Sequence, residues 1–122
     1  MMSKILIVED DKICALSLRL SLEKNGYEVL APVDTAEHGF NAALKHKPDV
    51  ILMDILLKGN ENGIDAALMI NNNINIPIIF VTGNEDMLEK DKLRNLKKYY
   101  VHSKPIDESL LFSTINTIIE NK

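Results

Sequence analysis

Five short, mostly apolar runs, separated by longer segments of mixed polarity, form the pattern of this chain. The runs lie at residues 5–8, 27–31, 49–53, 78–81 and 99–102. Runs of this length with many β-branched residues and little polar alternation are typical of strands buried on both faces. Turn-forming residues bound several of them, with Gly26 and Pro32 around the second run and Pro77 before the fourth. We therefore predict five strands.

The segments between these runs carry apolar residues at the three- and four-residue spacing of amphipathic helices. Short polar residues that can cap a helix start stand at Asp10 or Asp11, at Thr35 and at Asp107. A further helix is expected over residues 64–70, which are rich in alanine, leucine and methionine. Residues 85–96 have the weakest apolar stripe, and we predict a helix there as well.

Strands that alternate with helices predict an α/β fold with a parallel sheet, because parallel neighbours need a crossover connection. Right-handed crossovers place helices on both faces of such a sheet. The 122 residues suit one domain, and no internal repeat or linker interrupts the pattern. We therefore predict a single domain over residues 1–122 with a doubly wound five-stranded parallel sheet.

The charge and composition of the chain exclude several function classes. The formal net charge is −4, which gives no sign of direct nucleic-acid binding. The single cysteine, Cys14, excludes an intrachain disulfide, and the three scattered histidines lack metal-ligand spacing and are expected at the surface. No apolar run approaches the roughly 20 residues of a transmembrane helix, and residues 5–8 are too few for a signal-peptide core. The expectation is a cytoplasmic protein without membrane contact.

Carboxylates stand at the ends of two predicted strands. Glu9 and Asp10 follow the first strand, and Asp54 ends the third. Working sites in open parallel sheets lie outside the carboxyl ends of the strands, where neighbours are about 4.8 Å apart. Three acids there repel one another unless a cation neutralises them, and Mg²⁺ suits such a site. From the residues alone, a turn or capping role for Asp54 and a helix-dipole role for Glu9 and Asp10 stay open.

Two further strand ends carry residues that can bind phosphate oxygens. Thr82 follows the fourth strand and Lys104 follows the fifth. A hydroxyl and an ammonium beside acids and a metal form a phosphoryl-binding arrangement, because each charge of a transferring phosphoryl group gains a partner. Taken singly, Thr82 is an ordinary strand-end threonine and Lys104 a solvated lysine. The four strand ends together point to phosphoryl chemistry.

In the order and separation of four motifs, the chain resembles the receiver domain of bacterial two-component response regulators. The motifs are Val8-Glu9-Asp10-Asp11, Met53-Asp54-Ile55, Val81-Thr82-Gly83 and Ser103-Lys104-Pro105. The resemblance covers nearly the whole chain. It implies a flavodoxin-like strand order of 2-1-3-4-5. It also implies a stand-alone receiver or a piece of a longer protein, with no output domain within these residues.

The resemblance implies roles for the acidic residues. Asp54 would be the phosphoacceptor, whose carboxylate attacks the phosphorus of a phosphohistidine on a partner kinase. Asp10 and Asp54 would ligate Mg²⁺ as cofactor, with Glu9 acting through water and the Leu56 carbonyl as a further ligand. An acyl phosphate adds roughly two negative charges, which can bias a two-state rearrangement and switch a protein-interaction surface.

The resemblance also implies roles around the fifth strand. Lys104 would pair with Asp54 at rest and with a phosphoryl oxygen afterwards, and Thr82 would bond another phosphoryl oxygen. The bond before Pro105 is expected to be cis. Family members usually carry a tyrosine or phenylalanine three residues before the lysine, where this chain has Val101. Either the strand is shifted and Tyr100 takes that position, or the domain switches without an aromatic residue.

The implied partners are a sensor histidine kinase or phosphotransfer protein and a downstream protein target or fused output domain. The sequence leaves the oligomeric state open, including a dimer that forms on phosphorylation. No enzyme activity is expected beyond the domain's own phosphorylation and dephosphorylation. Two alternatives are a pseudo-receiver that only binds a partner and an Mg²⁺-dependent phosphohydrolase with Asp54 as nucleophile. Pseudo-receivers usually lack an acid or the lysine, and such hydrolases usually place an acid where this chain has Leu56.

Overall fold

The computed structural model describes residues 3–121. The strands are β1 (Lys4–Val8), β2 (Glu28–Val29), β3 (Val50–Asp54), β4 (Ile78–Thr82) and β5 (Tyr99–Ser103). The helices are α1 (Lys12–Lys24), α2 (Ala36–His46), α3 (Gly63–Asn71), α4 (Lys90–Leu93) and α5 (Glu108–Glu120), with a 3-10 turn, η1 (Glu85–Met87), before α4. Among these described helices, none has the length and apolar character needed to cross a membrane.

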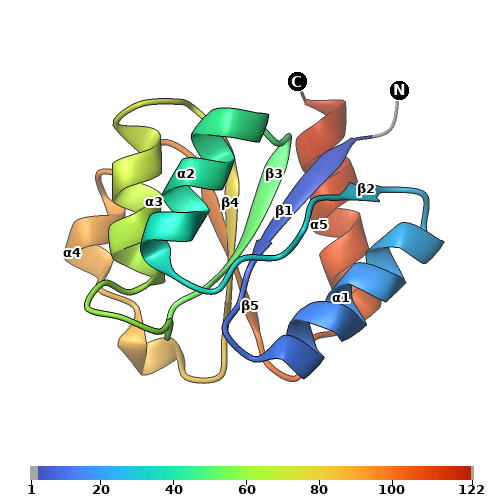
Figure 1. Cartoon of the computed structure of the whole chain (residues 1–122), viewed down its shortest axis with the longest axis horizontal. Coiled ribbons are helices and arrows are strands. Elements are labelled where there is room, and N and C mark those ends of the chain that lie inside the picture. The colour runs from blue at the N-terminus through green and yellow to red at the C-terminus, as the bar shows by residue number, and fades with distance from the viewer. Residues whose placement is uncertain (1–2, 122) are drawn as a thin grey trace.

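The strands form one five-stranded parallel sheet in the order β2-β1-β3-β4-β5. Helices α2, α3 and α4 cover one face, and α1 and α5 cover the other (Figure 1). The prediction of a doubly wound, flavodoxin-like sheet is therefore confirmed. Figure 1 also shows that β1 begins and α5 ends at the same edge of the sheet, opposite the carboxyl ends of the strands.

Two apolar layers attach the helices to the sheet. Alternate side chains of a strand point to opposite faces, so Met53 packs toward α2, α3 and α4 while Leu52 packs toward α1 and α5. Every residue of β3 and β4 is buried, including Asp54 and Thr82. A slip of one residue would turn each of these side chains to the other face. Core packing therefore fixes where Asp54 and Thr82 stand.

The second strand is shorter than the predicted span of residues 27–31. Only Glu28–Val29 pair regularly with β1. The chain stays close to β1 beyond this point, and the Val33 N–H donates to the Ile7 carbonyl at 3.0 Å. Pro32 has no N–H group to donate, so regular pairing ends at this edge of the sheet.

The prediction of one helix over residues 85–96 is wrong. The segment forms η1, then an extended residue at Leu88, and then the one turn of α4 that follows Glu89. The Asn84 side chain caps η1 by accepting a hydrogen bond from the Asp86 N–H at 2.9 Å, and such local bonds compete with a continuous helix. Few apolar positions of this segment share one face, so packing does not offset the cost of nucleating a longer helix.

His102, which we expect at the surface from the sequence, is only partly exposed. Its side chain is half-buried on β5, with Nε2 2.9 Å from Thr114 Oγ1 on α5. Burial lowers the pKa of His102 below its usual 6.5, and the nearby Asp107 carboxylate opposes this shift.

We expect the protonation of His102 to destabilise the fold as the pH falls below 6.5. The unfolded chain takes up a proton near the usual histidine pKa, whereas the folded protein does so only at lower pH, so protons favour the unfolded state. Urea unfolding between about pH 7.5 and about pH 5.5 should show the wild type losing stability relative to His102→Gln. An identical pH dependence of the two proteins would contradict this expectation.

Candidate functional site

The carboxyl ends of four strands meet along one edge of the sheet. The register pairs Val8 with Met53, Asp54 with Val81 and Thr82 with Ser103. Residues that end or follow these strands therefore stand side by side at the strand spacing. The residues of interest at this edge are Glu9, Asp10, Asp54, Thr82 and Lys104.

Three carboxylates gather at this edge, as the sequence predicts. Glu9, Asp10 and Asp54 each offer one oxygen, and these oxygens all lie within 4.8 Å of one another. Glu9 is 5% exposed and Asp54 is 8% exposed, so neither is an ordinary surface acid. The buried position of Asp54 as the last residue of β3 disfavours a simple turn or capping role.

Asp11, and not Asp10, is the N-cap residue of α1. The Asp11 carboxylate accepts hydrogen bonds from the N–H groups of Ile13 and Cys14 at 3.0 and 3.1 Å. Its own N–H donates to Glu9 Oε2 at 3.1 Å, which orients the Glu9 carboxylate. Asp10 is therefore left to the acid cluster rather than used as the helix cap.

Lys104 is the cation that faces this cluster. Its Nζ lies 2.8 Å from Glu9 Oε1 and 3.3 Å from Asp54 Oδ2. Burial lowers the pKa of Lys104, but the hydrogen bond to Glu9 and the charge of Asp54 outweigh burial and raise it overall. Lys104 therefore stays protonated and links the end of β5 to the ends of β1 and β3.

The charges at this edge do not balance within the site. Burial raises the pKa of Glu9, and the adjacent Asp54 carboxylate raises it further, while Lys104 and the Asp11 N–H oppose both effects. In the part of the chain that the structure describes, three carboxylates gather here, and the Lys104 ammonium pairs with two of them. Clustered hard oxygen donors with surplus negative charge are the donor set that Mg²⁺ prefers. The residues present thus fit a hard divalent cation.

Thr82 is buried at this edge, but its hydroxyl bonds within its own loop. Thr82 Oγ1 donates to the Asn84 carbonyl and accepts from the Asn84 N–H, both at 3.1 Å. Beside it on β5, Ser103 Oγ donates to Glu85 Oε1 at 2.6 Å. No pattern in the sequence indicates this Ser103–Glu85 bond, because it depends on how the loop after β4 brings η1 to β5.

The aromatic residues of β5 do not replace the one missing at Val101. Tyr100 pairs with Ile79 in an unshifted ladder and packs toward α1 and α5. Val101 lies on the opposite face with Phe80, which also contacts Tyr99 edge to face. The alternative in which a strand shift brings Tyr100 to the switch position is therefore excluded.

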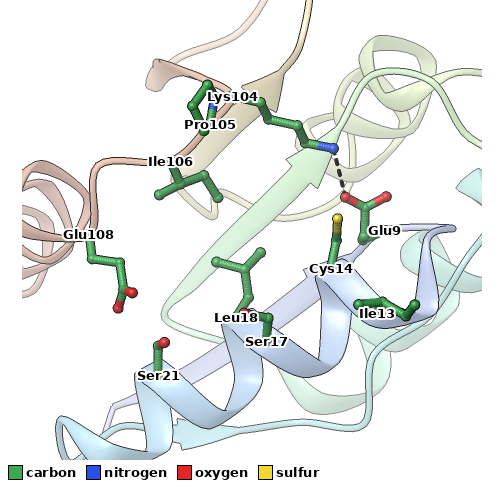
Figure 2. Close-up of a pocket in the computed structure, with 10 residues that line it drawn as sticks. All are labelled: Glu9, Ile13, Cys14, Ser17, Leu18, Ser21, Lys104, Pro105, Ile106 and Glu108. Carbon is green, nitrogen blue, oxygen red and sulfur yellow. Dashed lines mark hydrogen bonds and ion pairs between the residues drawn. The ribbon is translucent and has the colours of Figure 1, made fainter.

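A cavity of about 410 Å³ opens beside Lys104, between α1 and the segment that leads into α5. Ile13, Cys14 and Leu18 line one side, and Ile106 lines the other (Figure 2). Lys104 and Glu9, which are joined by a hydrogen bond, also line this cavity (Figure 2). The peptide bond that precedes Pro105 at this rim is cis, as expected.

Comparisons with known proteins agree with this architecture. The model of the response regulator receiver domain family matches residues 5–116. Protein PilH of Pseudomonas aeruginosa is 35% identical, and the match covers 97% of this chain and 98% of PilH. The response regulator ArlR of Staphylococcus saprophyticus is 38% identical over 73% of this chain and 40% of ArlR.

Solved structures give the same result. The signal receiver domain of a modulated diguanylate cyclase from Desulfovibrio desulfuricans has a TM-score of 0.89 and 31% identity, with 99% of this chain and 96% of that chain covered. The N-terminal domain of a response regulator/sensory box/GGDEF protein from Carboxydothermus hydrogenoformans has a TM-score of 0.85 and 32% identity, covering 96% of this chain and 94% of that chain.

Receiver domains are regulatory modules rather than conventional enzymes, and they interact with histidine kinases and output domains. As a family they generally bind Mg²⁺ at an acidic pocket, and this chain has an acidic cluster at the expected edge. The residues that match the family model include the carboxyl ends of β1, β3, β4 and β5, which form the site. This chain therefore belongs to the family of response regulator receiver domains.

Proposed function

We propose that this receiver is a phosphoacceptor of two-component signalling, in which Asp54 takes a phosphoryl group from a phosphohistidine of a sensor kinase or phosphotransfer protein. The observation that carries the proposal is the position of Lys104 Nζ, which contacts both Glu9 and Asp54 beside Asp10. A buried carboxylate with a cation at one oxygen and further acids nearby is arranged to accept a phosphoryl group, whose charge then gains partners.

The transfer is a substitution at phosphorus. A carboxylate oxygen of Asp54 attacks the phosphorus and forms an O–P bond, while the N–P bond of the phosphohistidine breaks. The ring nitrogen keeps the electron pair of that bond, and because the second ring nitrogen of the donor is protonated, the leaving group is a neutral imidazole. Asp54 is 8% exposed, so the donor has to approach it from the edge of the sheet where the acid cluster lies.

The acidic residues would hold a divalent cation during this step. We assign Asp10 and Asp54 as direct Mg²⁺ ligands, Glu9 as a ligand through water, and the Leu56 carbonyl as a further ligand. The fit rests on three carboxylate oxygens within 4.8 Å of one another and on their surplus charge. When bound, the ion neutralises charge on the transferring phosphoryl group. The Lys104 ammonium then releases a carboxylate oxygen and donates a hydrogen bond to a phosphoryl oxygen instead.

Thr82 supplies the conformational response in this proposal. Its hydroxyl leaves the Asn84 backbone and donates to a phosphoryl oxygen, which releases the loop at residues 83–85. Since Tyr100 lies on the other face of β5, the rearrangement proceeds through this loop and not through an aromatic side chain. The changed surface is what a downstream protein or a fused output domain would read.

The hydrolase alternative has less support. The side chain at the position of its usual second acid is Leu56, which is apolar and 58% exposed. It can neither protonate a leaving group nor activate water. The pseudo-receiver alternative also has less support, because the acids and the lysine are all present and in contact.

Incubation with acetyl phosphate and Mg²⁺ tests the proposal. Intact-mass measurement should show one phosphoryl group per chain, and chelation of Mg²⁺ with EDTA should prevent its addition. No label in either condition would favour a pure binding module. Sustained multiple turnover of generic phosphate esters would favour the hydrolase instead.

A further inference from the structure

Gly63, the first residue of α3, lies against the backbone at the end of β3. A Cβ atom built at this position would stand 2.0 Å from the Asp54 carbonyl oxygen and 2.9 Å from Met53 Cγ. The Gly63 N–H also donates to the Ile55 carbonyl at 2.8 Å. Gly63 therefore lies against the backbone carbonyl groups of both Asp54 and Ile55.

The start of α3 is fixed independently of this contact. Asn62 and Asp65 form a reciprocal capping box, with both side-chain-to-backbone bonds at 3.0 Å. Lys92 on α4 approaches the Asp65 carboxylate at 3.5 Å, and Ile64 is fully buried one residue after Gly63. A Cβ at Gly63 would thus require a shift between the start of α3 and the peptide that follows Asp54.

We propose that Gly63 is a positioning residue for the phosphoacceptor, whose missing side chain lets α3 rest directly on the Asp54–Ile55 peptide. The inference rests on the proposed function of Asp54. In this inference, Gly63 sets the distance between the Asp54 carboxylate and the Leu56 carbonyl, which are two of the proposed Mg²⁺ ligands.

The shift that a side chain at Gly63 would require is larger than the displacement that a metal site tolerates. Real Cβ atoms essentially never approach another atom within 3.0 Å, so a methyl group at Gly63 requires a shift of about 1 Å. Functional sites tolerate about 0.5 Å of displacement, and Mg²⁺ demands nearly ideal octahedral geometry. A misplacement of about 1 Å in a reacting group can lower a rate by about 100-fold.

Two other glycines provide matched controls. A Cβ at Gly39 on α2 would stand 3.1 Å from Val8 Cγ2, so it is crowded by a side chain and not by backbone. A Cβ at Gly83 would meet nothing within 4 Å, although Gly83 directly follows Thr82. Alanine at Gly39 therefore tests tight packing alone, and alanine at Gly83 tests proximity to the site alone.

The experiment compares Gly63→Ala, Gly39→Ala and Gly83→Ala with the wild type. Mg²⁺ affinity is measured by calorimetry, the metal-free amide resonances of residues 54–57 by NMR, and the initial rate of labelling by acetyl phosphate from intact mass. Urea unfolding sets conditions in which each chain is folded. Gly63→Ala should weaken Mg²⁺ binding by about tenfold, slow labelling by about 10- to 100-fold and shift these resonances. Both controls should keep their Mg²⁺ affinity within about threefold of the wild type, and Gly39→Ala should also keep its labelling rate within that range.

Mg²⁺ binding and labelling by folded Gly63→Ala within about threefold of the wild type would overturn the inference, as would equal losses in Gly39→Ala. If Gly63→Ala does not fold, Asn62→Ala decides, because it removes the side-chain bond that orders the start of α3 next to Gly63 and leaves Gly63 itself unchanged. It should weaken Mg²⁺ binding in the same direction, and unchanged affinity would reject the inference. Absence of label on the wild type would instead reject the proposed function, while the Mg²⁺ titrations still test Gly63.

Discussion

Replacing Asp54 with asparagine is expected to abolish labelling by acetyl phosphate, with a loss of about 10³-fold or more, as for removal of a nucleophile elsewhere. Asparagine has nearly the same shape, but its amide oxygen does not form a stable bond to phosphorus. The substitution also removes one of the clustered negative charges, so the metal-free protein should be at least as stable as the wild type. Intact-mass measurement after incubation with acetyl phosphate and Mg²⁺ gives the labelled fraction directly.

Substitutions at two other aspartates distinguish loss of the acceptor from loss of the charges around it. Asp10→Asn removes a proposed metal ligand but keeps the nucleophile, so labelling should slow and then recover as the Mg²⁺ concentration rises. Asp34→Asn removes an acid that pairs with His38 outside the cluster, and labelling should not change. Equal labelling of wild type and Asp54→Asn would place the phosphoryl group elsewhere and reject the assignment.

Replacing Lys104 with methionine is expected to destabilise the metal-free protein by about 2 kcal/mol. Removing one partner of a buried ion pair costs about 3–5 kcal/mol, and the 29% exposure of the Lys104 side chain reduces that figure. Glu9 and Asp54 would then face each other without a cation, and the pKa of Glu9 would rise further. Urea unfolding near pH 7 in the presence of EDTA measures the loss.

Mg²⁺ should restore much of the stability lost in Lys104→Met, because a bound cation replaces the missing positive charge. The gain on adding Mg²⁺ should therefore be larger for Lys104→Met than for the wild type. Lys97→Met changes an exposed lysine away from the acid cluster and should alter stability by less than about 0.5 kcal/mol. A loss at Lys104 that Mg²⁺ leaves untouched would indicate that packing of the lysine stem, and not its charge, is what matters.

The strands and the strand-end residues could be predicted because strong signals define them. The apolar runs around Leu52 and Ile79 fill the centre of the sheet, where only buried side chains fit. Once the strands are parallel, Glu9, Asp54 and Lys104 must end at one edge, so their meeting follows from topology. The cis bond before Pro105 was inferred from the family resemblance, since local sequence alone does not require it.

Other features could not be predicted because they depend on contacts between loops and elements. Asn84 bonds locally and ends the regular structure after β4, which a helical pattern does not reveal. The position of Tyr100 relative to the site required the register of β5 against β4. The close contact of Gly63 with Asp54 depends on how α3 lies against β3, which no pattern in the sequence defines.

The shared edge where β1 begins and α5 ends has a practical consequence (Figure 1). Because the acid cluster lies at the far side of the sheet, a fluorophore or surface tether attached near either of these points would stand well away from an approaching phosphodonor. Immobilised protein could then be exposed to successive donors in flow, with the edge that carries the acid cluster facing away from the support.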